Sequence, residues 1–207
     1  MIGVYDYTVL ATYLSLAFGV LGIFSAQDGA ALSALLCLML SGLLDAFDGR
    51  IARTKKDRTE REKRFGIQID SLNDLVCFGV LPAVVGGSLG GGWPMRAAAL
   101  FYILAALIRL AYFNVTEEER QSASDSRRSF YLGMPVTSAS FLVPLLLLLP
   151  PHFGLDAAAF CAVGLAVLGV LFILPVRVPK PGLCGIVLMA ALGAAELFLL
   201  LRAGMPL

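Results

Sequence analysis

The chain of 207 residues is 58% apolar and 15% charged, with a mean hydropathy of +0.83. Soluble globular domains are typically about 45–50% apolar and about 25% charged, so this composition excludes a water-soluble enzyme, a disordered chain and a secreted disulfide scaffold. Its 16 basic and 15 acidic residues give a net charge of +1, which argues against a nucleic-acid-binding protein. We therefore interpret the chain as an integral membrane protein.

Seven stretches approach or reach the roughly 20 apolar residues that a bilayer-spanning helix needs. They are residues 8–26, 29–49, 66–88, 95–115, 132–150, 155–175 and 182–203. We predict an all-α fold, a polytopic transmembrane helical bundle with a six-span core and a seventh span appended. The whole chain, 1–207, is expected to form a single integral membrane domain.

Lysine and arginine gather in every second connection between these spans. The connection after the second span holds eight of them within residues 50–64, and the connections after the fourth and sixth spans hold Arg120, Arg127, Arg128, Arg177 and Lys180. The opposite connections contain only Arg96. Because short cytoplasmic loops carry the excess of basic residues, we expect the amino terminus inside and the carboxyl terminus outside.

Several aromatic residues lie at or near the ends of the predicted spans. Tryptophan and tyrosine side chains concentrate at the membrane–water interface, where the ring is apolar and the polar group stays hydrated. The sequence therefore predicts interfacial anchors at Trp93, Tyr102, Tyr112 and Tyr131.

Four aspartates occur where the second and third spans meet the basic connection between them. Asp45 and Asp48 end the second span in LLDAFDGRIAR, and Asp70 and Asp74 begin the third in FGIQIDSLNDL. A charged residue inside a membrane helix costs roughly 2.5–3.5 kcal/mol on insertion scales and is a functional hypothesis by default. Spacings of three and four residues put each pair on one helix face, so two antiparallel spans can bring all four carboxylates together near the cytoplasmic surface.

Such an acidic group predicts a site for hard divalent cations. Four anions in a poorly hydrated site repel one another, and bound cations remove that conflict. Carboxylate oxygens suit Mg²⁺ or Mn²⁺, whereas zinc prefers histidine and cysteine, and the single histidine, His152, falls in an outer connection. A pair of such ions also suits substitution at phosphorus, where it holds the attacking and leaving oxygens.

Small residues and one arginine accompany the aspartates. Gly49, Ala52 and Gly66 would let a ligand approach the helix backbone, although close packing between helices explains small residues equally well. Arg53 is placed to hold a phosphate oxygen through its guanidinium, and its alternative role is contact with lipid headgroups.

The pattern Asp45-x-x-Asp48-Gly49-x-x-Ala52-Arg53, followed by Gly66-x-x-x-Asp70-x-x-x-Asp74, resembles the signature of the CDP-alcohol phosphotransferase family. The segments RLAYFNV (109–115) and FYLGMPVTSAS (130–140) resemble those of its phosphatidylserine synthase branch. The twelve residues between Arg53 and Gly66 exceed the spacing in many members by about one helical turn. The resemblance implies a catalytic core over about residues 1–175.

The resemblance implies a role for each matching residue. Asp45, Asp48, Asp70 and Asp74 would bind two divalent ions, Mg²⁺ or Mn²⁺, and Asp74 would also act as the base toward the acceptor hydroxyl. The cytidine diphosphate part would be held by Gly49, Ala52, Arg53 and Gly66, with Thr8 and Thr59 as further contacts. The implied reaction transfers the phosphatidyl group of CDP-diacylglycerol to L-serine and releases CMP.

The choice of serine depends on the resemblance and on the basic residues nearby. An amino acid brings a carboxylate that needs a cationic partner, and Arg109, Arg127 and Arg128 are available, with Asn114 in the branch-like segment. Family likeness also implies a homodimer in the plasma membrane of a prokaryote, surrounded by membrane lipids, with the active site facing the cytoplasm.

Two other functions remain open from the sequence. The acceptor could be glycerol 3-phosphate or an inositol phosphate, although each brings a phosphate that should need a denser cationic pocket. A divalent-cation transporter would also place acidic residues between membrane helices, but transporter sites tend toward the membrane midplane, whereas these four aspartates lie near one face.

Overall fold

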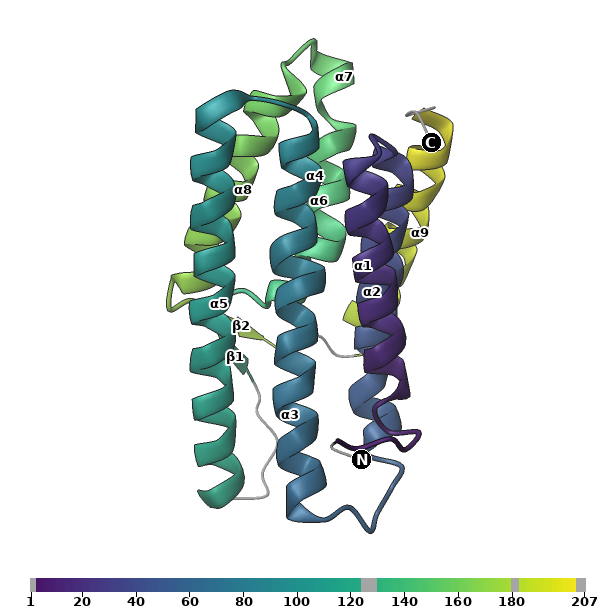
Figure 1. The fold of residues 1–207 in the computed structure, drawn as a ribbon, viewed down its shortest axis with the longest axis vertical. Coiled ribbons are helices and arrows are strands. Elements are labelled where there is room, and N and C mark those ends of the chain that lie inside the picture. Colours follow the sequence, from purple (N-terminus) through teal and green to yellow (C-terminus); the bar gives the residue numbers. More distant parts are fainter. Residues whose placement is uncertain (1–2, 124–129, 180–182, 204–207) are drawn as a thin grey trace.

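The structure, a computed structural model, describes residues 3–123, 130–179 and 183–203. The described chain is an elongated bundle of helices that run roughly along its long axis (Figure 1). The elements are α1 (Leu10–Gln27), α2 (Ala31–Ala52), α3 (Glu60–Asp74), the π-helix η1 (Leu75–Val80), α4 (Leu81–Ser88), α5 (Gly92–Ala123), β1 (Phe130–Leu132), the 3-10 helix η2 (Val136–Ser138), α6 (Ala139–Leu148), α7 (Pro150–Phe153), α8 (Ala157–Ile173), β2 (Arg177–Pro179) and α9 (Leu183–Ala203).

The helices lie within or across the seven predicted spans, and the prediction of a polytopic helical membrane protein is confirmed. The fifth span differs from its predicted range of 132–150, because strand β1 ends at Leu132 and the α-helix α6 covers only Ala139–Leu148. Within the described parts of the chain, four helical stretches are long and apolar enough to cross a bilayer, namely Leu10–Gln27, Ala31–Ala52, Glu60–Ser88 and Gly92–Glu119. Shorter apolar helices follow at Val136–Leu148 and Ala157–Ile173, and α9 corresponds to the seventh span. Each long apolar segment forms a helix because a helix satisfies all of its backbone hydrogen bonds within the segment, as a bilayer requires.

The third span is one continuous rod in which α3, η1 and α4 follow one another through the centre of the molecule (Figure 1). Its middle part, immediately after Asp74, has the wider π-helical turn. π-Helical turns occur mostly as single turns inside α-helices, frequently at functional sites. There the Phe78 carbonyl accepts a hydrogen bond of 2.6 Å from the hydroxyl of Tyr102 on α5.

This contact corrects the prediction that Tyr102 is an interfacial anchor. Its side chain is fully buried, and its ring lies 5.3 Å from that of Phe172 on α8. By contrast, Trp93 and Tyr112 are exposed, with relative accessibilities of 76% and 52%. The aromatic type alone predicted an interfacial position for all of them, whereas Tyr102 has a carbonyl partner in the core and can therefore be buried.

Successive connections were predicted to lie at opposite ends of the bundle, and the positions of the chain ends agree with this prediction. The start of α1 lies at the same end as the α2–α3 connection, and α9 ends at the other (Figure 1). Strands β1 and β2 pair antiparallel, with Leu132 opposite Arg177, so the connections after the fourth and sixth spans meet. Among the described residues, these two three-residue strands differ from the predicted all-α fold.

Candidate active site

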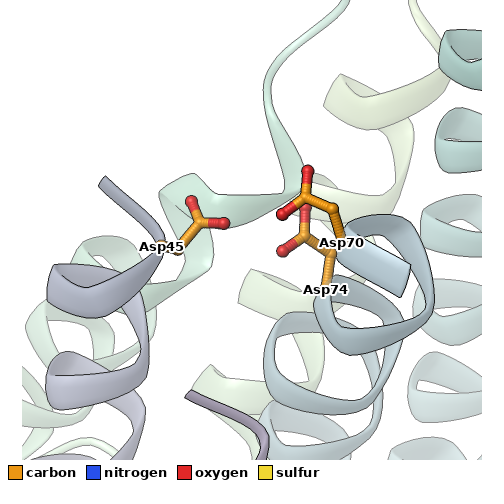
Figure 2. A group of neighbouring side chains, drawn as sticks. All are labelled: Asp45, Asp70 and Asp74. Carbon is orange, nitrogen blue, oxygen red and sulfur yellow. The ribbon is translucent and has the colours of Figure 1, made fainter. Parts of the chain in front are cut away.

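Three of the four predicted aspartates form a compact group between two antiparallel helices. Asp45 projects from α2, and Asp70 and Asp74 project from consecutive turns of α3 toward it (Figure 2). One carboxylate oxygen from each residue lies within 4.8 Å of the corresponding oxygens of the other two. The spacing of four residues on α3 is what aligns Asp70 and Asp74 on the face that meets α2.

Asp48 lies beside this group, one helical turn nearer the α2–α3 connection. It is buried, and its Oδ2 accepts a hydrogen bond of 3.1 Å from the hydroxyl of Thr12 on α1. Its carboxyl group interacts with that of Asp70, as the carboxyl group of Asp45 does with that of Asp74. The four aspartates thus form two facing pairs at two depths.

Two carboxylate oxygens of this acidic group have no hydrogen-bond donor among the described residues. Asp70 Oδ1 and Asp74 Oδ1 are both buried without a hydrogen-bond partner. A buried carboxylate oxygen without a donor is costly, and a hard cation that prefers oxygen ligands would satisfy it. The acidic group therefore fits the divalent cations that the sequence pattern predicts.

A cavity of about 600 Å³ opens beside the aspartates toward the α2–α3 connection. Asp48 and Asp70 form part of its wall. Five residues that we predicted at the nucleotide also line it, namely Thr8, Gly49, Ala52, Arg53 and Gly66. Its volume lies within the range of about 300–1,000 Å³ typical of small-molecule sites.

Other predicted site residues have different surroundings. Thr59 does not line the cavity but caps α3, because its hydroxyl accepts from the Glu62 backbone N–H while the Glu62 side chain accepts from the Thr59 N–H. This capping box gives Thr59 a structural role at the start of α3, and the nucleotide contact expected at Thr59 stays a prediction. The spacing Thr59-x-x-Glu62 is itself a capping signal, and it could have been recognised in the sequence.

The two described acceptor candidates, Arg109 and Asn114, lie on α5 and do not line the cavity. Asn114 accepts a hydrogen bond of 2.6 Å from Ser71 and donates to Gln68, so it joins α5 to α3. Arg109 is buried, with its guanidinium carbon 5.5 Å from the centre of the Phe113 ring. Arg127 and Arg128 lie outside the described residues.

The segment before α1 is tied to the α2–α3 connection by an ion-pair cluster that we did not predict. Lys55 Nζ lies 2.8 Å from Asp6 Oδ2 and 2.8 Å from Glu62 Oε1. Hydrogen bonds from Lys55 and then from Thr8 hold the pKa of Asp6 at about 2, below its usual 3.8, and those two carboxylates raise the pKa of Lys55. This clamp holds Thr8 at the cavity.

A buried polar network that we also did not predict supports the aspartates from the membrane side. Asn73 donates to the Ser15 hydroxyl at 3.2 Å, and Ser15 and Ser41 exchange hydrogen bonds with each other's backbone carbonyls. Cys77 donates to Asn73 Oδ1. These polar residues stood out within apolar spans, but their partners could not be known before α1, α2 and the third span were packed together.

Comparison with known proteins agrees with this geometry. The sequence model described as CDP-alcohol phosphatidyltransferase matches residues 7–176. A CDP-diacylglycerol–serine O-phosphatidyltransferase of Helicobacter pylori is 34% identical over 184 residues, which cover 85% of this chain and 73% of that protein. One from Mycobacterium tuberculosis is 32% identical over 145 residues, or 69% and 49% of the two chains.

A relative named for a different lipid product is also similar. The archaetidylserine synthase of Methanothermobacter thermautotrophicus is 32% identical over 108 residues, which cover 51% of this chain and 46% of that protein. The matched family region contains the second and third spans, with all four aspartates and the cavity residues of α2 and α3. The extent of that match, together with the paired carboxylates, shows that this chain belongs to the CDP-alcohol phosphatidyltransferase family.

Proposed function

We propose that this protein transfers the phosphatidyl group of CDP-diacylglycerol to the hydroxyl of L-serine, giving phosphatidylserine and CMP. The observation that carries the proposal is the acidic group of Asp45, Asp70 and Asp74, beside a cavity that Asp48, Asp70, Arg53 and the small residues Gly49, Ala52 and Gly66 line. Relatives whose printed names specify a serine acceptor support the choice of substrate.

Asp45, Asp48, Asp70 and Asp74 would hold two divalent ions, Mg²⁺ or Mn²⁺. Bound there, the ions would neutralise charge on the diphosphate and on the departing CMP. The carboxylates keep their positions because α2 and α3 present them on facing sides, and Thr12 fixes the orientation of Asp48. Preorganisation of this kind is how an enzyme stabilises developing charge.

Side chains of this protein would bind the nucleotide and transfer the proton. Arg53 would hold a phosphate of the nucleotide, and Gly49, Ala52, Gly66 and Thr8 would shape its site. Asp74 would take the proton from the serine hydroxyl, whose oxygen attacks the phosphorus that carries the lipid. The new P–O bond forms as the bond between that phosphorus and the CMP oxygen breaks, and CMP leaves with the electron pair.

Arginines of α5 and of the connection after it would pair with the carboxylate of serine. Asn114 contacts Ser71, and Arg109 lies five residues earlier in a helix that runs antiparallel to α3. At 1.5 Å per residue this puts Arg109 about 7.5 Å farther into the bundle, at about the depth of Asp74. That position supports a role for Arg109 beside the base, with Asn114, Arg127 and Arg128 completing the acceptor site.

We further propose the setting in which the enzyme works. The basic connections and the cavity would face the cytoplasm, and the chain would reside in the plasma membrane of a prokaryote as a homodimer. Residues 1–207 would form one membrane domain whose catalytic core is residues 1–175, with the seventh span appended. The positive-inside rule supports the orientation.

Purified protein in detergent, supplied with CDP-diacylglycerol and Mg²⁺ or Mn²⁺, tests the proposal directly. CMP release that begins only when L-serine is added is the expected result, with phosphatidylserine as the lipid product. Equal release with glycerol 3-phosphate or an inositol phosphate would reject serine but keep the reaction class. If no acceptor causes CMP release and the protein carries metal ions across the membrane of proteoliposomes, the enzyme proposal is rejected and the protein is a transporter.

A further inference from the structure

Arg58 occupies a position at the cavity that the sequence pattern does not assign. It lies in the α2–α3 connection, and its half-buried side chain lines the cavity together with Arg53 and Gly66. One terminal nitrogen, Nη2, donates a hydrogen bond of 3.1 Å to the Glu62 carbonyl oxygen in the first turn of α3. The guanidinium therefore folds back against α3 at the cavity wall.

A second donor of the guanidinium, beside Nη2, is unsatisfied. Arg58 Nε is buried and has no hydrogen-bond partner among the described residues. Two neighbouring cations of the same wall are neutralised, because Lys55 pairs with Asp6 and Glu62, and Lys63 pairs with Glu60. A buried guanidinium donor that lacks an acceptor indicates a missing anionic ligand, since charged donors lose most when left unpaired.

Gly66 creates the space that Arg58 fills. A Cβ atom added at Gly66 would lie 2.7 Å from Arg58 Nη2, too close for the present arrangement. Gly66 also precedes Asp70 by four residues, so both lie on one face of α3, about one turn apart. The guanidinium thus stands one helical turn from a carboxylate of the acidic group, on the side of the α2–α3 connection.

We infer that Arg58 binds the phosphate nearest the cytidine of the substrate, and that Gly66 is glycine so that Arg58 can lie across it. This inference rests on the proposed function and adds a ligand to its nucleotide site. A diphosphate that begins at the aspartates and extends toward the connection would bring its second phosphate to Arg58. Guanidinium groups suit that contact because their planar donors match phosphate oxygens.

Inhibition by CMP and by cytidine separates a phosphate contact from a contact with the base or sugar. CMP keeps the phosphate in question, whereas cytidine lacks it. We expect R58Q to weaken inhibition by CMP about 10-fold, the loss typical of one charge-assisted hydrogen bond, and to leave inhibition by cytidine unchanged. The KM for L-serine should also stay unchanged. R61Q is the matched control, because Arg61 is exposed and does not line this cavity.

A double-mutant cycle tests the role of Gly66. G66A should weaken CMP inhibition in the wild-type background, where the new methyl group displaces Arg58, and should add little in the R58Q background. Equal losses in both backgrounds would mean that Gly66 contacts the nucleotide directly, and would overturn this part of the inference. R58K, which keeps the charge but loses the planar fork, should fall between wild type and R58Q.

The remaining outcomes are equally decisive. Unchanged CMP inhibition in R58Q, or parallel losses for CMP and cytidine, would overturn the phosphate assignment. If R58Q fails to fold, the same comparison is made with R58K, whose CMP inhibition should be weaker while its cytidine inhibition matches wild type. If wild-type protein neither binds CMP nor releases it, the proposed function fails, and this result is distinct from any difference between variants.

Discussion

Thr12 on α1 donates a hydrogen bond of 3.1 Å to Asp48 Oδ2 on α2, and both residues are buried. This bond joins the first span to the acidic group, although the sequence pattern assigns nothing to Thr12. A carboxylate that holds a metal ion works best when a fixed donor orients it, and losing such a donor typically weakens metal binding about 10–100-fold.

We therefore expect Thr12→Val to raise the Mn²⁺ or Mg²⁺ concentration needed for half-maximal activity about 10-fold. Valine keeps the shape of threonine but cannot donate. A metal titration of CMP release measures the effect, and Thr12→Ser, which retains the hydroxyl, should restore most of the affinity. Identical titration curves for wild type and Thr12→Val would contradict a role for this hydrogen bond.

Asp74→Asn should reduce turnover by about 10²–10⁴-fold, the usual contribution of a positioned general base, while the protein still folds. Asparagine has nearly the same size but cannot accept the proton of the acceptor hydroxyl. The initial rate of CMP release measures turnover, and size-exclusion chromatography in detergent checks the fold. Asp57→Asn, at an exposed position in the α2–α3 connection, should keep the wild-type rate. Near-normal rates for Asp74→Asn would remove it as the base.

Tyr102→Phe should destabilise the folded protein by about 1–3 kcal/mol, the penalty for leaving a buried polar group without its partner. The unpaired group would be the Phe78 carbonyl within the π-helical turn. Unfolding in detergent, followed by circular dichroism against denaturant, measures the change. The control is Tyr112→Phe, which removes a hydroxyl from an exposed ring on the same helix. Equal stabilities for the two variants would show that the Tyr102 hydroxyl contributes nothing.

The clamp around Lys55 should hold with constant strength between pH 5 and pH 9. The pKa of Asp6 is lowered to about 2, so its stabilising contribution is present above pH 3.8 and is lost as the pH falls through about 2. The pKa of Lys55 is raised, so its contribution is present below pH 10.5 and is lost as the pH rises beyond that value.

Lys55→Met tests the clamp, because it removes the cation that both carboxylates share. Its melting temperature should lie below that of wild type by the same interval at every pH from 5 to 9, and the interval should shrink below pH 3. Lys56→Met, at the exposed neighbouring position, should lack this pattern. An interval that changes steadily across neutral pH would contradict the pKa directions of Asp6 and Lys55.

Much of the fold could be predicted from the sequence because it depends on local properties. Hydropathy over about 20 residues predicted the spans, since the bilayer demands that length from a helix regardless of its neighbours. The aspartates at spacings of three and four residues predicted their shared faces for the same reason, because helical periodicity is a property of one helix. Asp45, Asp70 and Asp74 do meet as that periodicity requires.

What the sequence could not provide were the partners contributed by other helices. Tyr102 looked like an interfacial ring until packing placed it against Phe78, and the hydrogen bond that joins Asn114 to Ser71 on α3 could not be known from either helix alone. Such pairs depend on how each helix is rotated and shifted against the next, which side-chain packing across the whole bundle determines.

The sequence by itself therefore determined the membrane class, the positions of the spans and the acidic pattern of α2 and α3. Only the tertiary structure decided that Thr12 orients Asp48 and that Arg58 lies over Gly66. The physical reason is distance along the chain. Periodicity relates residues within one or two turns of a helix, whereas contacts between segments exist only after the segments have packed together.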